Sequence, residues 1–259
     1  MLPRPPFISI ITVNYNSGHL LEGTARSVLA QTYPHLEYLL VDGGSSDHSH
    51  TIFKLIERVN DRLLNAKILR WHSEPDQGLY DAMNKGLRMA KGDFVLFLNA
   101  GDRLLEPKTL EKAMLHCTPD TDVLFGEAML VTETRHHLGT RSQLTVQKLP
   151  ETLTWQSLRM GMVVCHQAFL ARKSIAPFYM ENNLSADIDW VIEVLKKSRK
   201  TVNTHLVLAE YLVGGISKQQ HRQSLKDRYG ILKKHFGFWP NLWAHGRIFL
   251  RAFFANNSY

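Results

Sequence analysis

The sequence predicts an α/β protein whose mostly parallel central sheet carries helices on both faces. Apolar runs of strand length alternate with segments of helical periodicity over the first hundred residues. The predicted strands are nearly continuous in Val, Ile, Leu and Phe, as is typical of parallel strands buried on both faces. A length of 259 residues fits one large domain better than two separate ones.

The first half of the chain alternates strictly between strands and helices. Strands are predicted over Phe7–Asn14, Glu37–Asp42, Ala66–Trp71 and Phe94–Leu98. Helices are predicted over Leu20–Ala30, around the stripe Ile52, Leu55, Ile56 and Val59, and over Gly78–Lys91 with the stripe Leu79, Ala82, Met83, Gly86, Leu87 and Ala90. Together these elements form a Rossmann-like, four-strand nucleotide-binding half.

The second half follows a looser pattern. A helix is predicted near Thr109–His116, short strands near Val123–Phe125 and Ala128–Thr132, and polar residues then continue through Leu149. A strand near Gln167–Ala171, a helix near Asp187–Lys197 and a strand near Thr204–Glu210 close the fold.

The composition indicates a cytoplasmic protein. Apolar residues make up 44% of the chain and charged residues 21%. No stretch approaches the about 18 apolar residues that span a bilayer, and the first six residues lack the apolar core of a secretory signal. Cys117 and Cys165 lie in apolar stretches without metal-ligand spacing, so we expect reduced core residues.

The net charge of +7 lies in the C-terminal tail, residues 218–259. This segment holds eight Lys or Arg residues against the single acid Asp227, and it interleaves them with Phe and Trp. We expect a helical, basic tail that associates with an anionic membrane surface, and no nucleic-acid partner. The alternative is a helix that covers the core and exposes solvated lysines.

Two predicted strands deliver a carboxylate to the same edge of the sheet. Asp42 and Asp102 follow the second and fourth strands, and ligands of open parallel sheets bind beyond the carboxyl ends of the strands. Asp47 is better explained as a helix cap. Neither a dinucleotide-binding glycine motif nor a P-loop is present, so a different nucleotide-binding scheme is needed.

Four motifs in order make the sequence resemble a family 2 glycosyltransferase of the GT-A fold. They are Ile8–Asn16, Val41–Asp47, Ser73–Gly86 and Phe97–Asp102. The resemblance covers roughly residues 7–217 and is closest to bacterial exopolysaccharide enzymes of the colanic-acid kind, on account of His166-Gln167, Ala186–Trp190 and Gly214–Ser217. It implies a GT-A domain over residues 1–217, with a nucleotide-binding half (1–102) and an acceptor-binding half (103–217).

The resemblance implies a site for a nucleotide-diphosphate sugar. Thr12, Asn14 and Asp42 would hold the base and ribose, with Asp42 accepting a hydrogen bond from uracil or guanine. The segment Asp76–Gly86, beginning with Asp76, would close over the donor and bring Asn84 and Lys85 near the diphosphate. An ordinary amphipathic surface helix is the alternative for this segment.

The resemblance also implies a metal site at Asp102. As an exposed strand-end carboxylate, Asp102 would coordinate Mg²⁺ or Mn²⁺ bridging the two phosphates. Asn99 and Gly101 stand where this family often has further carboxylates. The predicted site therefore rests on one protein carboxylate.

The catalytic base implied by the resemblance is Asp187, which would deprotonate the acceptor hydroxyl and invert the anomeric centre. Asp189, two residues later, is the competing acid, and a helix cap is the structural alternative for both. His166 and Gln167 would lie on the acceptor side. His136 and His137 are interpreted as loop residues.

The sequence thus predicts a cytoplasmic, inverting glycosyltransferase at the inner face of the cell membrane. Its acceptor would be a saccharide or a lipid-linked saccharide in surface polysaccharide synthesis. One alternative is a non-catalytic subunit that binds sugar nucleotides. A sugar nucleotidyltransferase is the other, although the basic, Gly-rich loop of those enzymes is missing after the first strand.

Overall fold

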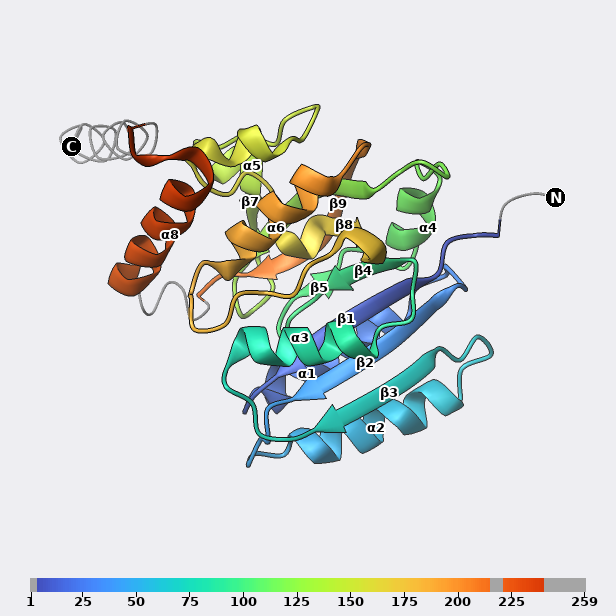
Figure 1. Ribbon diagram of the computed structural model, residues 1–259. Helices are drawn as coiled ribbons and strands as arrows, with labels where there is room; N and C mark the ends of the chain where they lie inside the picture. Colours follow the sequence, from blue (N-terminus) through green and yellow to red (C-terminus); the bar gives the residue numbers. More distant parts are fainter. Residues whose placement is uncertain (1–3, 215–220, 240–259) are drawn as a thin grey trace.

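The computed structural model describes residues 4–214 and 221–239 (Figure 1). The strands are β1 (Ile8–Asn14), β2 (Leu36–Asp42), β3 (Ile68–Ser73), β4 (Phe94–Phe97), β5 (Arg103–Leu104), β6 (Val123–Val131), β7 (His137–Thr140), β8 (Phe169–Arg172) and β9 (Thr201–Leu212). The α-helices are α1 (Gly18–Leu29), α2 (Ser49–Asp61), α3 (Leu79–Met89), α4 (Thr109–Met114), α5 (Arg141–Leu144), α6 (Ala186–Lys197) and α8 (His221–Phe236). Short 3₁₀ turns are η1 (Trp155–Met160), η2 (His166–Ala168) and η3 (Lys173–Ile175).

The described strands form one sheet in the order β3-β2-β1-β4-β8-β6-β9-β5, with β7 beside β6. The four N-terminal strands are parallel, as the sequence predicts. In their register Asn14 pairs with Asp42, and Asp42 pairs with Ser73. Polar residues from three strands therefore meet in one row at the carboxyl edge of the sheet.

The second half adds strands of both directions to this sheet. β8 runs antiparallel to β4 and to β6, whereas β9 runs parallel to β6. The carboxyl ends of β6 and β9 and the start of β8 therefore lie at the same edge as the end of β4. This topology brings η2 and the β6–β7 hairpin to the row of polar strand ends.

Several predicted boundaries in the second half are wrong. The two short strands around residue 126 are one strand, β6, with register shifts between Phe125 and Ala128. The polar segment before Leu149 contains β7 and α5, whose pattern is set by pairing with β6 rather than by local periodicity. His166–Ala168 form a 3₁₀ turn, so β8 starts at Phe169.

Helices cover both faces of the sheet, as predicted (Figure 1). Buried side chains of α3 and α6 pack in one hydrophobic cluster, and those of α1, α2 and α4 pack in the other. In α2 the predicted stripe is wrong at Leu55, which is 37% exposed. Phe53 is buried instead, one turn after the buried Ser49 and in line with Ile56.

The described part of the basic tail is helical and belongs partly to the core. Ile231 and Leu232 of α8 are buried in the cluster that also contains α6. Phe236 stacks on Trp155 with ring centroids 5.3 Å apart. The first part of the tail thus covers the core, as the alternative interpretation proposed. The predicted division between the two halves of the domain at residue 102 and the predicted end of the domain at residue 217 stay predictions.

Two observations bear on the chain's environment. Among the described residues, none of the helices combines the length and the apolar character needed to cross a bilayer. Cys117 and Cys165 are free, and both are partly exposed rather than fully in the core.

Substitution by alanine should have opposite effects on stability at two helical glycines. A Cβ on Gly86 of α3 would overlap the side chain of Ile11, whereas a Cβ on Gly230 of α8 would meet nothing within 4 Å. We expect Gly86→Ala to lower the free energy of unfolding by about 1–3 kcal/mol through overpacking. Gly230→Ala should raise it by about 0.4–1 kcal/mol. Urea denaturation measures both, and equal effects would contradict the packing of α3 on β1.

Candidate functional site

The carboxylate of Asp42 ties the carboxyl ends of three strands together. Its Oδ1 accepts from Asn14 Nδ2 (2.7 Å) and Ser45 Oγ (2.6 Å), and its Oδ2 accepts from Ser45 N (2.9 Å) and Ser73 Oγ (2.7 Å). Burial acts to raise the pKa of Asp42, but these hydrogen bonds outweigh it and lower the pKa. Each oxygen already accepts two bonds, which leaves no lone pair open for the expected nucleobase.

Thr12 and Asn14 on β1 differ in what they offer to a ligand. Thr12 is fully buried, and its hydroxyl bonds to Leu98 O (2.7 Å) inside the sheet. The structure therefore does not bring Thr12 to the site. Asn14 donates to Asp42 and Ser49, but its Oδ1 is buried without a hydrogen-bond partner among the described residues. Asn14 thus keeps one open acceptor at the strand end.

Asp76 lies beside the Asp42 cluster. Its Oδ1 accepts from Gly78 N (2.8 Å), and its other oxygen packs where a Cβ of Gly43 would be. Burial raises the pKa of Asp76, and the nearby acids Asp81 and Asp42 add to the increase. Only a glycine at position 43 leaves room for this carboxylate at the edge of the sheet.

Asn84 and Lys85 hold α3 in place. The buried amide of Asn84 donates to Tyr179 O (3.0 Å) and accepts from Tyr179 N (2.7 Å). Lys85 Nζ donates to Pro75 O (2.8 Å) and pairs with Glu74 (2.9 Å). Both side chains are engaged within the protein, so the structure does not present them to a diphosphate.

Asp102 is buried, so the expectation of an exposed carboxylate is wrong, whereas its role as a metal ligand stays a prediction. Its side chain accepts from Gln167 Nε2 (2.8 Å) and Leu212 N (2.9 Å), and burial raises its pKa to about 7. Gln167 is therefore a partner of Asp102. At the same strand end, Asn99 Oδ1 is buried, and none of the residues that the structure describes gives it a hydrogen bond.

Asn99 offers this strand end an open oxygen for a divalent cation, besides the two carboxylate oxygens of Asp102, each of which accepts one hydrogen bond. The unpartnered Asn99 Oδ1 is an oxygen donor of the kind that Mg²⁺ and Mn²⁺ accept, and substrate phosphates commonly complete such sites. Within residues 4–214 and 221–239, no group of three or more His, Cys, Asp or Glu residues is placed to hold a metal.

Arg135 is a residue of this edge that the sequence did not indicate. It lies in the hairpin between β6 and β7, where its Nη2 donates to Gly101 O (2.8 Å) and its Nη1 lies 3.6 Å from Glu210. Its backbone has φ of +64°, a conformation that is uncommon for a residue other than glycine. No motif marked Arg135, because the hairpin reaches the residues after β4 only through the pairing of β6 with β8 and of β8 with β4.

His166 connects Asn99 to Asp187. Asn99 Nδ2 lies 3.4 Å from His166 Nε2, and His166 Nδ1 lies 3.9 Å from Asp187 Oδ2. Because the amide nitrogen can only donate, Nε2 accepts and the ring proton faces Asp187 from Nδ1. Burial lowers the pKa of His166 to about 4, so the ring is neutral.

The two acids at the start of α6 have different environments. The side chain of Asp187 is 29% exposed and accepts from Ile188 N (2.9 Å), and burial raises its pKa to about 6. Asp189 is buried, and its Oδ1 accepts from Lys234 Nζ (2.8 Å) and His235 Nε2 (2.7 Å) of α8. Asp187 is therefore available for proton transfer, whereas Asp189 anchors a helix.

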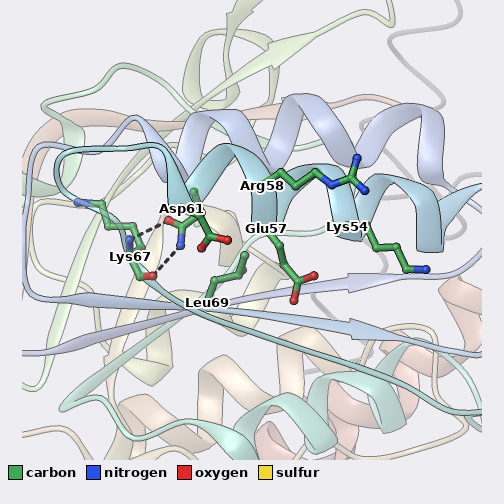
Figure 2. Close-up of a pocket in the computed structure, with 7 residues that line it drawn as sticks. Lys54, Glu57, Arg58, Asp61, Lys67 and Leu69 are labelled. Atoms are coloured by element: carbon green, nitrogen blue, oxygen red, sulfur yellow. Dashed lines mark hydrogen bonds between the residues drawn. The ribbon is translucent and has the colours of Figure 1, made fainter.

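A cavity of about 530 Å³ lies between α2 and the start of β3, away from these residues (Figure 2). Its lining mixes both signs of charge: Lys54, Glu57, Arg58, Asn60, Asp61, Lys67 and Leu69. Asn60 and the backbone of Lys67 exchange two hydrogen bonds that close the α2–β3 connection. Lys67 precedes β3, so this cavity lies at the amino end of that strand, opposite the polar strand ends.

Comparison with known proteins shows which families and chains this sequence is similar to. The family model described as "Glycosyl transferase family 2" matches residues 9–176. A PGL/p-HBAD biosynthesis glycosyltransferase of Mycobacterium tuberculosis is 30% identical over 221 residues, covering 82% of this chain and 79% of the relative. The putative teichuronic acid biosynthesis glycosyltransferase TuaG of Bacillus subtilis is 28% identical, covering 80% and 79%.

Solved structures share the fold. S. aureus TarS 1–349 in complex with UDP-GlcNAc superposes with a TM-score of 0.69 at 18% identity, over 87% of this chain and 64% of that one. The mannosyltransferase PcManGT from Pyrobaculum calidifontis, in complex with GDP-Man and Mn²⁺, has a TM-score of 0.66 at 16% identity, over 93% and 69%. The fold is therefore of the GT-A type, as predicted.

The Asp42 cluster predicts a large stability effect. Asp42→Ala removes the acceptor for Asn14, Ser45 and Ser73, and each buried donor left unsatisfied costs about 1–3 kcal/mol, so we expect the free energy of unfolding to fall by about 3–5 kcal/mol. Asp76→Ala is the matched control, because it loses one backbone hydrogen bond and should cost about 0.5–1.5 kcal/mol. Chemical denaturation of both variants tests this, and equal losses would show that Asp42 does not hold the strand ends.

Proposed function

The chain belongs to glycosyl transferase family 2, and on that premise we propose that it is an inverting glycosyltransferase of cell-surface polysaccharide synthesis. It would move a sugar from a nucleotide-diphosphate sugar to a saccharide or lipid-linked saccharide. The observation that carries the proposal is Asp187, a partly exposed carboxylate that His166 connects to the end of β4. The names of the mycobacterial and Bacillus relatives support the class of product.

Asp187 has the properties of a general base. Its pKa of about 6 makes the carboxylate more basic than an ordinary one, yet still ionised at neutral pH. We propose that one carboxylate oxygen takes the proton of the acceptor hydroxyl as that oxygen attacks the anomeric carbon. The bond to the nucleoside diphosphate breaks in the same displacement, so the anomeric configuration inverts. Neutral His166 orients the base without competing for the proton.

Asp76 and Asn14 are the open acceptors for the nucleobase and ribose. Uracil and guanine both carry a ring N–H that a carboxylate can accept, and Asp76 has an oxygen free for it beside Gly43. Asp42 then positions these groups instead of contacting the base. The solved relatives hold UDP-GlcNAc in one case and GDP-Man in the other, which fits a donor of either class.

Mg²⁺ or Mn²⁺ is part of the proposal, with Asn99 Oδ1 as the protein ligand. Such an ion, when bound with the donor, supplies positive charge to the departing diphosphate. PcManGT was solved with Mn²⁺. Arg135 adds a positive charge beside Gly101, to whose carbonyl it donates. The carboxylate of Asp102 accepts from Leu212 N and so ties the segment after β4 to the end of β9.

We propose that the exposed side of the tail associates with the inner face of the cell membrane. Arg222, Lys226 and Lys233 are exposed on α8, and Phe238 and Trp239 are 45% and 76% exposed just beyond it. The remaining basic and aromatic residues, from Trp243 to Phe254, lie outside the described residues. The closer likeness to colanic-acid enzymes stays a prediction.

The non-catalytic alternative is disfavoured by the site. A subunit that only binds sugar nucleotides has no need of an available carboxylate with a raised pKa, but Asp187 is one. Membership of family 2 also removes the basis for a sugar nucleotidyltransferase.

Asp187→Asn tests the catalytic proposal. Loss of a general base should lower kcat about a hundred- to ten-thousand-fold. Binding of UDP or GDP, measured by calorimetry, should be retained because Asp187 lies on the acceptor side. Asp189→Asn is the matched control and should lose stability before it loses transfer, since its carboxylate anchors α8. A larger kinetic loss in the Asp189 variant would overturn the choice between the two acids.

Vesicle sedimentation tests the membrane proposal. Each Lys or Arg near an anionic surface contributes about 1 kcal/mol, so binding should require anionic lipid and weaken as salt is raised. Truncation after residue 239 and the pair Phe238→Ser with Trp239→Ser should both reduce binding without removing the buried part of α8. Equal recovery in the supernatant with neutral and anionic vesicles would refute the membrane role.

A further inference from the structure

Hydrogen bonds near both ends of α8 hold this helix against the start of α6. Near its N-terminal end, Ser185 Oγ donates to Ser224 O (3.0 Å) and Leu184 N donates to Asp227 Oδ2 (2.9 Å). Near its C-terminal end, Lys234 and His235 hold Asp189. The helix therefore has a fixed position beside the residues that carry the proposed base.

Arg228 lies on the face of α8 that meets α6. The contact residues Ser224, Ile231 and His235 recur at helical spacing, and Arg228 falls between them at i+4 from Ser224. Its Nε is buried without a hydrogen-bond partner among the described residues. Ser185 and Asp189, on either side of Asp187 in the chain, both contact α8, which places the face of α8 that carries Arg228 against the turn that carries Asp187. No ion pair within 4.0 Å joins Arg228 to Asp187 in the described residues.

The buried His, Cys and Tyr side chains around Asp187 are uncharged at neutral pH, and the other acids of this region are Asp227 of α8, which accepts from Leu184 N, and Asp102. Burial is the first cause in every case: it lowers the pKa of His166 to about 4, raises the pKa of Cys165 and of Tyr211 to about 12, and raises the pKa of Tyr80 and of Tyr179 well above the usual value. Asp189 is already paired with Lys234 and His235. Arg228 is thus the permanent charge that favours the ionised form of Asp187 in the described residues.

We infer that Arg228 is a positioning residue that keeps the carboxylate of Asp187 ionised for proton abstraction, and that α8 is part of the active site. This inference rests on the proposed function of Asp187. Partial burial favours the protonated acid, which cannot act as a base, and a nearby guanidinium opposes that effect. α8 therefore has one side, with Arg228, that faces α6 and Asp187, and another, with Arg222 and Lys226, that faces solvent.

The experiment compares Arg228→Gln and Arg228→Lys in the full chain with Arg222→Gln and Lys226→Gln, two exposed cations of the same helix. The pKa of Asp187 is followed by carbon-13 NMR of the side-chain carboxyl groups, with Asp187→Asn identifying the signal. In Arg228→Gln it should rise by about one unit, because a nearby opposite charge shifts a carboxyl pKa by about 1–3 units. Arg228→Lys and both controls should stay near the parent value.

The pH profile of kcat gives the second readout, with UDP-glucose and GDP-mannose as donor probes. The ascending limb should move to higher pH in Arg228→Gln, giving about a fivefold loss near pH 6 that approaches about tenfold at lower pH and shrinks as the pH is raised. An unchanged Asp187 pKa, or a loss of kcat equal at all pH values, would overturn the inference. If the pKa moves but Asp187→Asn keeps full activity, the electrostatic coupling stands and the proposed function of Asp187 fails. Should Arg228→Gln not fold, Arg228→Lys against Arg228→Met gives the same comparison.

Discussion

The carboxylate of Asp42 is the interaction on which the rest of the site depends. Three parallel strands end side by side, and their last polar residues meet at one carboxylate that accepts four hydrogen bonds. A buried charge costs several kcal/mol unless it is fully hydrogen-bonded, so this cluster fixes the relative positions of β1, β2 and β3. Asp76 and the open Asn14 carbonyl are placed by this cluster.

A second constraint acts at the start of α6, where burial and pairing set the pKa values of two acids. Asp187 and Asp189 are two residues apart on one helix, yet α8 pairs only with Asp189. Pairing lowers the pKa of Asp189, whereas burial without a direct partner raises the pKa of Asp187. The same helix thus carries one acid that α8 pairs and one whose carboxylate is partly exposed.

The end of β4 brings together polar groups from three parts of the chain. Asn99 offers a neutral oxygen, Asp102 is committed to Gln167 and Leu212, and Arg135 reaches over Gly101 from a distant hairpin. The charge balance of the site is therefore distributed over three segments far apart in the chain.

The sequence by itself determined the parallel half of the fold and the order of the motifs, because strand and helix periodicity and strand-end residues are local properties. It also selected Asp187 through its resemblance to family 2. It could not show that Thr12 is buried in the sheet, that Asn84 clamps Tyr179, or that Asp102 is enclosed by Gln167 and Leu212. Those outcomes depend on contacts between residues 65 to 110 positions apart, and only the tertiary structure decides which polar atoms such contacts occupy. Strand pairing places Arg135 and helix docking places Arg228, and both depend on contacts with distant parts of the chain.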